Sequence, residues 1–327
     1  MKILYAAGNR SASGLQFKRI KENLSEHEIK FAGFASSTQF VSDIDFLLDY
    51  FYSDFYDLVW NKIKSGKFNL EMEEFCCSIL EFSPDLIIVD DEPLLISLGN
   101  FLKIPVWNCS PINLMDGCNH QIDDLSYRYI FHLQKIDHKL RSKPERNLIY
   151  SPFYFSNELK IKNSFEWIKP YSVKIHNEEE KDLNLTILSQ REKKIFEILK
   201  YSKYEGCFFS NSKFGTNKIA GYQINDTEYQ TLLSQSKNVF CAAESSFLID
   251  ALISESNIFV FPNLKDLETL INASILQGLN FGIDLGQIEL MEKCGVDEIN
   301  RQLNRNFHLN KFKEKNISYL HDLINKG

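Results

Sequence analysis

Short apolar runs alternate with longer amphipathic segments along most of this chain. The runs have the length of strands, and the segments between them repeat apolar residues every three or four positions, as helices do. In the N-terminal half the predicted strands cover residues 2–7, 28–34, 84–90, 105–108 and 148–153, and the predicted helices cover residues 15–24, 40–68, 71–82, 93–102 and 127–141. This alternation predicts a mostly parallel sheet with helices on both faces.

A second series of the same kind follows residues 155–182, which lack a clear period and are rich in Lys, Asn and Glu. We therefore predict a boundary near residue 165, with domains of residues 1–165 and 166–327. A length of 327 residues suits two domains of ordinary size. The predicted strands of the second series are residues 183–188, 207–210, 239–242 and 258–261, and the predicted helices are residues 192–201, a segment from Asp266 and residues 312–324.

Charge and cysteine usage limit the class of protein. The net charge of −7 argues against broad, nonspecific binding of nucleic acid, although a local basic groove is compatible with it. The seven cysteines are odd in number and form no Cys-x-x-Cys pair, which favours free thiols in a reducing compartment. The apolar run at the N-terminus is too short for a signal peptide, and no run of 18 apolar residues is present. We expect a cytoplasmic protein, in a bacterial cell or a phage-infected host.

Two strand-to-helix junctions follow each other between Asn238 and Gly282. In a parallel sheet, these junctions place two helix N-termini at one edge. Free backbone N–H groups and the helix dipole both favour an anion at such an edge, so the segment is suited to a diphosphate.

The segment resembles the donor-binding half of GT-B glycosyltransferases, especially the group of the lipid-linked peptidoglycan N-acetylglucosaminyltransferase and the UDP-glycosyltransferases. Those enzymes carry a Gly-Gly-x-Ser/Thr turn, a Glu on the next helix, a Pro after the next strand and then Asp-x-x-Gln-x-x-Asn-Ala. The matching positions here are Ser246, Asp250, Pro262, Asp266, Asn272 and Ala273. Ala243 and Glu244 replace the glycines, Asp250 replaces Glu, and Thr269 replaces Gln. The resemblance implies two Rossmann-like α/β domains facing across a cleft, with the last helix crossing back onto the first domain.

The resemblance also assigns roles at the donor site. The turn of Ala243, Glu244, Ser245 and Ser246 would offer amides and hydroxyls to the diphosphate. Asp250 would bind the ribose, and Asp266 and Thr269 would contact the sugar. From position alone, the loop after the strand 207–210 is a further candidate, in which Ser210 and Lys213 would meet the diphosphate or the base. Lys213 would offset the carboxylate of Glu244.

The strand 84–90 ends in Asp90-Asp91-Glu92-Pro93. Adjacent carboxylates repel one another, which favours a raised pKa and a general base. Asp-x-Glu-Pro also resembles a poorly characterised GT-B branch that begins with Met-Lys-Ile-Leu-Tyr and carries Gly-His-x-x-Arg in its first loop. The chain has Gly14-Leu15-Gln16-Phe17-Lys18 there, without the His, so Asp91 and then Asp90 are the candidate bases. The alternative is that the acidic run caps the helix that begins at Pro93.

The loop from Gly8 to Gly14 lacks the glycine spacing of a dinucleotide fingerprint, which argues against a nicotinamide-dependent oxidoreductase. We predict that Gly8, Asn9, Arg10, Ser13 and Gly14 approach the acceptor or a phosphate; an ordinary turn is the alternative. We predict no metal site and no cofactor, and we interpret Asp43-Ile44-Asp45 as a helix cap.

The sequence thus predicts a metal-independent, inverting hexosyl- or pentosyltransferase that uses a nucleotide-diphosphate sugar, foremost a UDP-sugar. The acceptor is a glycan, a small molecule or a hydroxylated base in phage DNA. The acidic net charge argues against the last of these, and a basic cleft formed by the stretch from Lys135 to Arg146 would offset that charge. A nucleotide-sugar 2-epimerase and a degenerate, non-catalytic nucleotide-sugar-binding protein are the alternatives.

Overall fold

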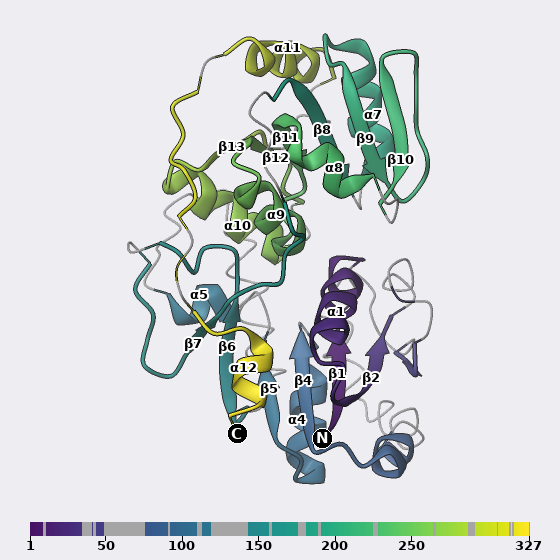
Figure 1. Cartoon of the computed structure of the whole chain (residues 1–327), viewed down its shortest axis with the longest axis vertical. Helices are drawn as coiled ribbons and strands as arrows, with labels where there is room; N and C mark the ends of the chain where they lie inside the picture. The colour runs from purple at the N-terminus through teal and green to yellow at the C-terminus, as the bar shows by residue number, and fades with distance from the viewer. Residues whose placement is uncertain are drawn as a thin grey trace. The chain divides into compact units, whose positions relative to one another are not determined.

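The computed structural model of the chain consists of two compact units (Figure 1). The first unit contains Met1–Tyr171 and Asn316–Gly327, and the second contains Ser172–Lys315. The chain therefore passes from the first unit to the second after Tyr171. The sequence predicts a boundary near residue 165. The structure describes residues 1–8, 11–34, 41, 44–48, 76–90, 92–109, 113–118, 143–156, 159–175, 181–188, 191–224, 228–263, 266–286, 292–305, 307–313, 315 and 317–326.

The first unit is built on a sheet of seven parallel strands in the order β3-β2-β1-β4-β5-β6-β7. Its strands are β1 (Lys2–Ala7), β2 (Glu28–Gly33), β3 (Phe46–Leu47), β4 (Leu86–Asp90), β5 (Val106–Asn108), β6 (Arg146–Tyr150) and β7 (Glu166–Ile168). The helices are α1 (Ser11–Asn23), α4 (Pro93–Leu102), α5 (Asn113–Gly117) and α12 (Leu320–Ile324), and residues 76–82 are also helical.

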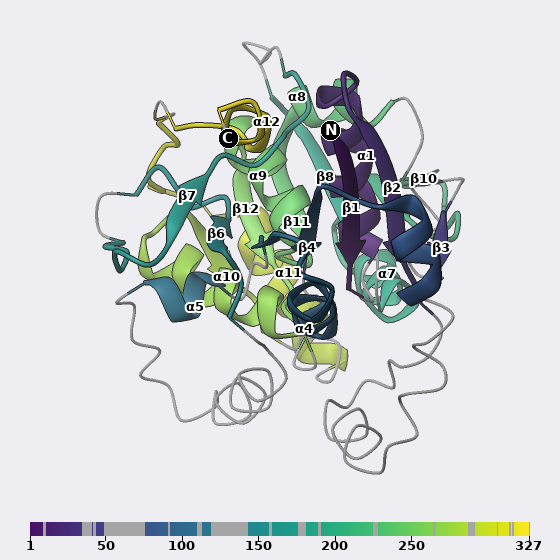
Figure 2. The same ribbon diagram turned by 90° about the horizontal axis from the view of Figure 1, so that it is seen from below.

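Alternate residues of the central strands β1 and β4 enter two separate cores. On one face Tyr5 and Ile88 contact apolar residues of α1 and α12, including Phe17 and Leu323. On the other face Leu4, Ile87 and their neighbours contact α4 and the helical residues 76–82. Figure 2 shows α12 and α4 on opposite sides of the sheet. The sheet is thus covered on both faces, as its continuous apolar runs predict.

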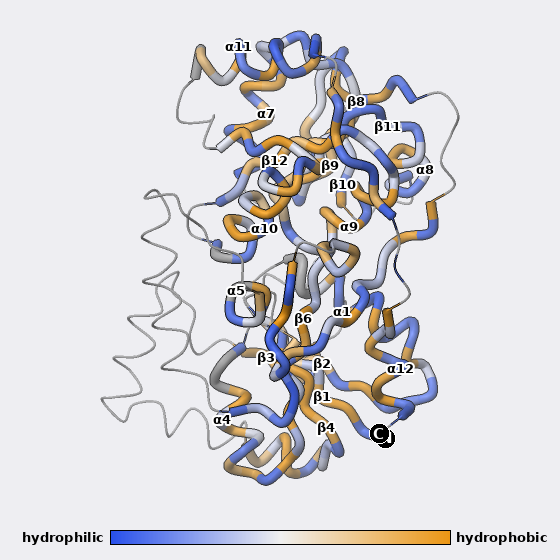
Figure 3. The backbone as a smooth tube through the Cα atoms, turned by 90° about the vertical axis from the view of Figure 1, so that its left-hand side faces the viewer, coloured by the Kyte–Doolittle hydropathy of each residue, from blue (hydrophilic) through white to orange (hydrophobic). Residues whose placement is uncertain are grey.

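The second unit is built on a six-stranded parallel sheet in the order β10-β9-β8-β11-β12-β13. Its strands are β8 (Leu183–Leu188), β9 (Gly206–Ser210), β10 (Ile219–Gln223), β11 (Ser236–Cys241), β12 (Asn257–Val260) and β13 (Gly282–Asp284). Its helices are α7 (Glu192–Tyr201), α8 (Tyr229–Ser234), α9 (Ser245–Ile253), α10 (Leu267–Gly278) and α11 (Glu292–Leu303). Helices α7 and α11 share a core on one face, and α9 and α10 contact β11 and β13 respectively. Figure 3 shows hydrophobic stretches both in strands of the two sheets and in helices such as α10.

Several predicted elements differ from the structure. Helix α1 begins at Ser11 and not at residue 15, because small residues are tolerated in a first turn and the apolar stripe of Phe17, Ile20 and Leu24 anchors the helix. Ser13 and Gly14 therefore belong to a helix and not to the predicted loop. Residues 166–168 form β7 within the stretch predicted as a linker. They are a strand because they pair with β6, although the local sequence has no clear period of apolar residues.

The C-terminal helix is also shorter than predicted. It covers Leu320–Ile324, while the described residues between 312 and 319 are not helical. Residues 46–47 form a strand inside the aromatic segment predicted as a helix; most of that segment, and residues 127–141, lie outside the described residues. No helix in the described ranges has the length and apolar character needed to cross a membrane.

Candidate functional site

In both sheets the strand order reverses direction next to the first strand, and some of the predicted site residues lie at that position. The reversal falls between β1 and β4 in the first unit and between β8 and β11 in the second. Ligands of open α/β sheets bind outside the carboxyl ends of the strands at such a switch point. β1 and β4 are the two central strands of the first sheet; Gly8 directly follows β1, and Asp90 is the last residue of β4. In the second sheet, Ala243 lies just after the end of β11.

Asp90 is the last residue of β4 and is paired with Ala7 of β1. Its carboxylate accepts a hydrogen bond from the Tyr5 hydroxyl at 3.0 Å, and the residue is 0% exposed. Burial, and next the charge of Asp90, raise the pKa values of the Tyr5 hydroxyl and the Cys109 thiol well above their ordinary values. The side chain thus lies in the core beneath the sheet edge, and the role of Asp90 as a base stays a prediction.

The other predicted residues of the first unit are distributed differently. Gly8 donates its backbone N–H to the Asp90 carbonyl at 2.7 Å, which ties the end of β1 to the end of β4. Glu92 is buried and precedes the first residue of α4, where the sequence suggests a cap. Asn9, Arg10 and Asp91 lie outside the described residues. The structure therefore describes Asp90 and the strand ends around it, but not Asp91, the first candidate base.

The turn before α9 has an uncommon backbone. Ala243 adopts a left-handed conformation with a φ of 65°, although it is not glycine. An L-residue in this conformation costs about 1–2 kcal/mol, which glycine avoids. Glu244 is the N-cap residue in an extended conformation, but its carboxylate does not cap the helix. The turn thus keeps the conformation that a glycine would favour at the position where the resembled family has one.

Two side chains of α10 hold this turn from the next helix along the chain. The Glu268 carboxylate accepts the Ser245 backbone N–H at 2.8 Å. The Asn272 amide donates to the Ala243 carbonyl at 2.8 Å and to the Ser245 hydroxyl at 3.1 Å. All four residues are at most 4% exposed. A carboxylate of the chain therefore occupies one amide at the N-terminus of α9.

Asp266 and Thr269 both help to form the start of α10. The Asp266 carboxylate accepts the backbone N–H groups of Glu268 at 3.0 Å and Thr269 at 3.4 Å, which is an N-cap. The Thr269 hydroxyl donates to the Asp266 carbonyl at 3.1 Å and accepts the Asn263 N–H at 2.9 Å. These contacts explain both residue types structurally, and the contact with a sugar stays a prediction.

Asp250 lies in the middle of α9 and is 0% exposed. One carboxylate oxygen accepts the Val173 backbone N–H at 3.1 Å, and the other accepts the Tyr229 hydroxyl at 3.0 Å. Asp250 thereby joins α9 to α8 and to the first residues of the second unit. The ribose role that the resemblance gives it stays a prediction, and these two hydrogen bonds would compete with it.

The loop after β9 begins at the same edge of the second sheet. Ser210 pairs with Leu188 of β8, is buried and donates its hydroxyl to the Ser212 carbonyl. Lys213 is exposed. Burial raises the pKa of Glu192, and hydrogen bonds from its own N–H and from the Asn211 N–H lower it by less. The start of α7 is thus connected to this loop.

Arg191 is a cation at this edge that the sequence analysis did not select. It is the N-cap residue of α7, with a left-handed φ of 57°, and its guanidinium donates to the Phe261 carbonyl just after β12. Phe261 in turn donates its N–H to the Cys241 carbonyl at the end of β11 at 2.9 Å. The guanidinium therefore reaches across the strand ends next to the α9 turn. Its position between a predicted strand and a predicted helix could have identified it.

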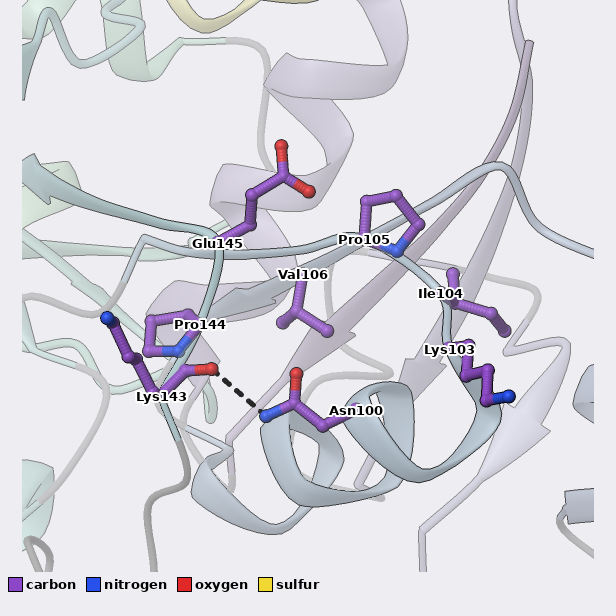
Figure 4. A pocket seen from close by; sticks show the side chains of 8 residues that line it. All are labelled: Asn100, Lys103, Ile104, Pro105, Val106, Lys143, Pro144 and Glu145. Carbon is purple, nitrogen blue, oxygen red and sulfur yellow. Dashed lines mark hydrogen bonds between the residues drawn. The ribbon is translucent and has the colours of Figure 1, made fainter.

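The described surface also contains a depression of about 330 Å³ in the first unit (Figure 4). It is lined by Asn100, Lys103, Ile104, Pro105, Val106, Lys143, Pro144 and Glu145. The Asn100 amide donates to the Lys143 carbonyl across it at 3.0 Å. Val106 begins β5 and Glu145 precedes β6, so the depression lies at the amino ends of the strands, opposite the edge of Asp90.

Comparison with solved structures defines the fold class. The spinosyn rhamnosyltransferase SpnG aligns with a TM-score of 0.62 and 13% identity over 93% of this chain and 92% of that chain. The Streptomyces sp. SF2575 glycosyltransferase SsfS6, complexed with thymidine diphosphate, aligns with a TM-score of 0.56 and 12% identity over 100% of both chains. The calicheamicin glycosyltransferase CalG4 gives 0.51 and 11% over 93% and 92%. The chain has the two-unit α/β fold of the GT-B glycosyltransferases.

Sequence comparison adds nothing to this classification. No model of a known protein family and no curated protein matches the chain. At these identities the likeness concerns the fold, and the expected relation to the peptidoglycan N-acetylglucosaminyltransferase group stays a prediction.

Proposed function

We propose that this protein transfers a sugar from a nucleotide-diphosphate sugar to a hydroxyl group of an acceptor. The observation that carries the proposal is the likeness of 93% or more of the chain to solved glycosyltransferases. Two of these, SpnG and SsfS6, were crystallised with thymidine diphosphate. The donor is a UDP- or TDP-sugar, and the sugar is a hexose or a pentose.

The second unit supplies the donor site in this proposal. The N-terminus of α9 and the guanidinium of Arg191 lie at the switch point between β8 and β11, and both attract a diphosphate. Lys213 adds an exposed positive charge from the loop after β9. Glu244 and Glu268 oppose the diphosphate at the same turn, so the site is a balance of charges and not a simple anion hole.

The first unit supplies the acceptor site and the base. In a single displacement, the base takes the acceptor proton while the acceptor oxygen bonds to the anomeric carbon. The bond from that carbon to the diphosphate oxygen breaks, and its electron pair leaves with the diphosphate. Because Asp90 is buried against Tyr5, Asp91 is the preferred base. One displacement inverts the anomeric configuration, and we propose that it needs no metal ion or cofactor.

The acceptor is a glycan, a small molecule or a hydroxylated base in phage DNA. The names of the structural neighbours favour a small molecule, because SpnG was also crystallised with the spinosyn aglycone. The DNA acceptor rests on the basic stretch from Lys135 to Arg146 and requires a base that has left the duplex stack.

A nucleotide-sugar-binding protein without transferase activity is the second candidate. The Glu268 carboxylate on the Ser245 amide favours it, because a bound anion must compete with that contact.

A thermal-shift screen with UDP, TDP and their sugar conjugates tests the proposal first. A ligand at 100 times its dissociation constant adds about 2.7 kcal/mol of stability. Chromatography of the donor then distinguishes three outcomes: transfer or slow hydrolysis supports a transferase, conversion of the sugar without an acceptor indicates a 2-epimerase, and binding alone indicates a binding protein. Asp91→Asn should abolish transfer while it preserves the thermal shift. If no nucleotide or nucleotide sugar raises the melting temperature, the proposal fails.

A further inference from the structure

We propose that Glu268 is an internal competitor for the donor diphosphate, and that it sets the affinity of the α9 turn for the phosphates of the donor. This inference rests on the proposed function and concerns the regulation of the same site. The carboxylate accepts the Ser245 N–H, and donor binding has to displace it or tolerate its charge.

The contact has the chemistry of an anion at a helix N-terminus. Ser245 is the first residue of α9, and its N–H points at the Glu268 carboxylate at 2.8 Å. Amides of the first helical turn have no partner within the helix and carry the positive end of the helix dipole. A phosphate oxygen and a carboxylate oxygen compete for such an N–H as charged acceptors. The Glu268 carboxylate is thus bound where the proposed function requires a phosphate oxygen.

The competitor is held in position by the helix that carries it. Glu268 lies in the first turn of α10, and its own N–H is capped by Asp266. Asn272, one turn later on the same face of α10, donates to the Ala243 carbonyl and to the Ser245 hydroxyl. Figure 1 shows α9 and α10 side by side, and the two helices are in contact. The carboxylate is therefore presented to the turn by a fixed helix and not by a mobile loop.

The position of α10 links the two ends of the donor. Asp266 and Thr269, the predicted sugar contacts, lie at the start of the same helix that carries Glu268. A sugar that displaces the cap of α10 would also shift Glu268 relative to Ser245. The diphosphate and the sugar are thus expected to open the turn together, and a nucleoside diphosphate without the sugar is expected to bind against the full competition.

The charge series of the ligand tests the inference. Glu268→Gln keeps an oxygen that can accept the Ser245 N–H, but it removes the negative charge and about half the strength of the hydrogen bond. Calorimetry with uridine, uridine monophosphate and uridine diphosphate, and with the corresponding thymidine compounds, measures each affinity. The variant should bind the nucleoside as the wild type does and should bind the diphosphate about tenfold more tightly.

Glu205→Gln is the matched control. Glu205 is an exposed residue just before β9, at the amino end of the same sheet, and it pairs with Lys218 at 3.5 Å. The substitution removes the same charge from the same unit and should leave every affinity unchanged. Melting temperatures without ligand confirm that both variants are folded; if Glu268→Gln does not fold, Glu268→Asp, which shortens the reach to Ser245, should show the same preference for the diphosphate.

The outcomes separate this inference from the proposed function. Wild type that binds uridine or thymidine diphosphate, with equal or weaker binding by Glu268→Gln, overturns the inference and leaves the transferase proposal standing. An equal gain for the nucleoside and the diphosphate also overturns it, because competition between anions acts only on charged ligands. If neither the wild type nor the variant binds any of these nucleotides, both proposals fail.

Discussion

Replacing Ala243 by glycine tests how the α9 turn is built. Ala243 and its neighbour Ala242 are both buried, with 0% and 2% exposure. They differ in the backbone, because Ala243 is left-handed with a φ of 65° and Ala242 is not. Any buried alanine changed to glycine loses the burial of a methyl group, about 0.8 kcal/mol, and gains freedom in the unfolded chain, about 0.4–1 kcal/mol. Ala242→Gly should therefore destabilise the protein by about 1–2 kcal/mol.

The same losses apply to Ala243→Gly, but the release of the left-handed alanine returns about 1–2 kcal/mol. Its net effect should be close to zero. The difference between the two neighbouring variants isolates the backbone contribution, because the side-chain and unfolded-state contributions are shared. Ala242→Gly is thus the control variant for the backbone strain at Ala243.

Urea denaturation of wild type and both variants measures this difference, provided that the slope with urea stays constant. Two variants with equal losses of about 1–2 kcal/mol would refute the left-handed conformation of Ala243. The same proteins also bear on function: if the turn receives the diphosphate, Ala243→Gly should bind uridine or thymidine diphosphate at least as well as the wild type does.

Three further predictions concern other parts of the second unit. Gly221→Ala should cost about 3 kcal/mol of unfolding free energy, because its Cβ would lie 1.5 Å from a carbonyl oxygen of the loop before β10. Gly215→Ala, with its nearest neighbour at 3.4 Å, should cost less than about 1 kcal/mol in the same denaturation experiment, and equal costs would contradict the loop packing. Tyr229→Phe should lose about 1 kcal/mol of stability but no nucleotide affinity, whereas Asp250→Asn should lose both; calorimetry with equal nucleotide affinities in wild type and both variants would remove Asp250 from the site. Burial raises the pKa of Glu192, so its charged form destabilises the folded protein above that pKa. Glu192→Gln should therefore be more stable than wild type at pH 7, and the difference should shrink as the pH falls toward 4.5, the ordinary pKa; a difference that grows on acidification in thermal melts would contradict this.

The repeating pattern of apolar residues determined the fold class and most of the strands. Residues 183–188, 192–201 and 93–102 form the predicted elements with the predicted bounds, because each has a strong local period and a clear start or stop signal. Short elements with weak local patterns, such as β7, β10 and β13, were not predicted. Their strand conformation depends on pairing with a neighbouring strand that lies far away in the sequence.

For the candidate site, too, the sequence predicted one part and the tertiary structure added the rest. The sequence alone identified the two strand-to-helix junctions and the absence of the family's glycines, because residue types at fixed spacings carry that information. Only the tertiary structure brought the Glu268 carboxylate to the Ser245 amide and the Arg191 guanidinium to the end of β12. These contacts join segments that are separate in the chain, and a parallel sheet brings its strand ends and helix starts together only after it has folded.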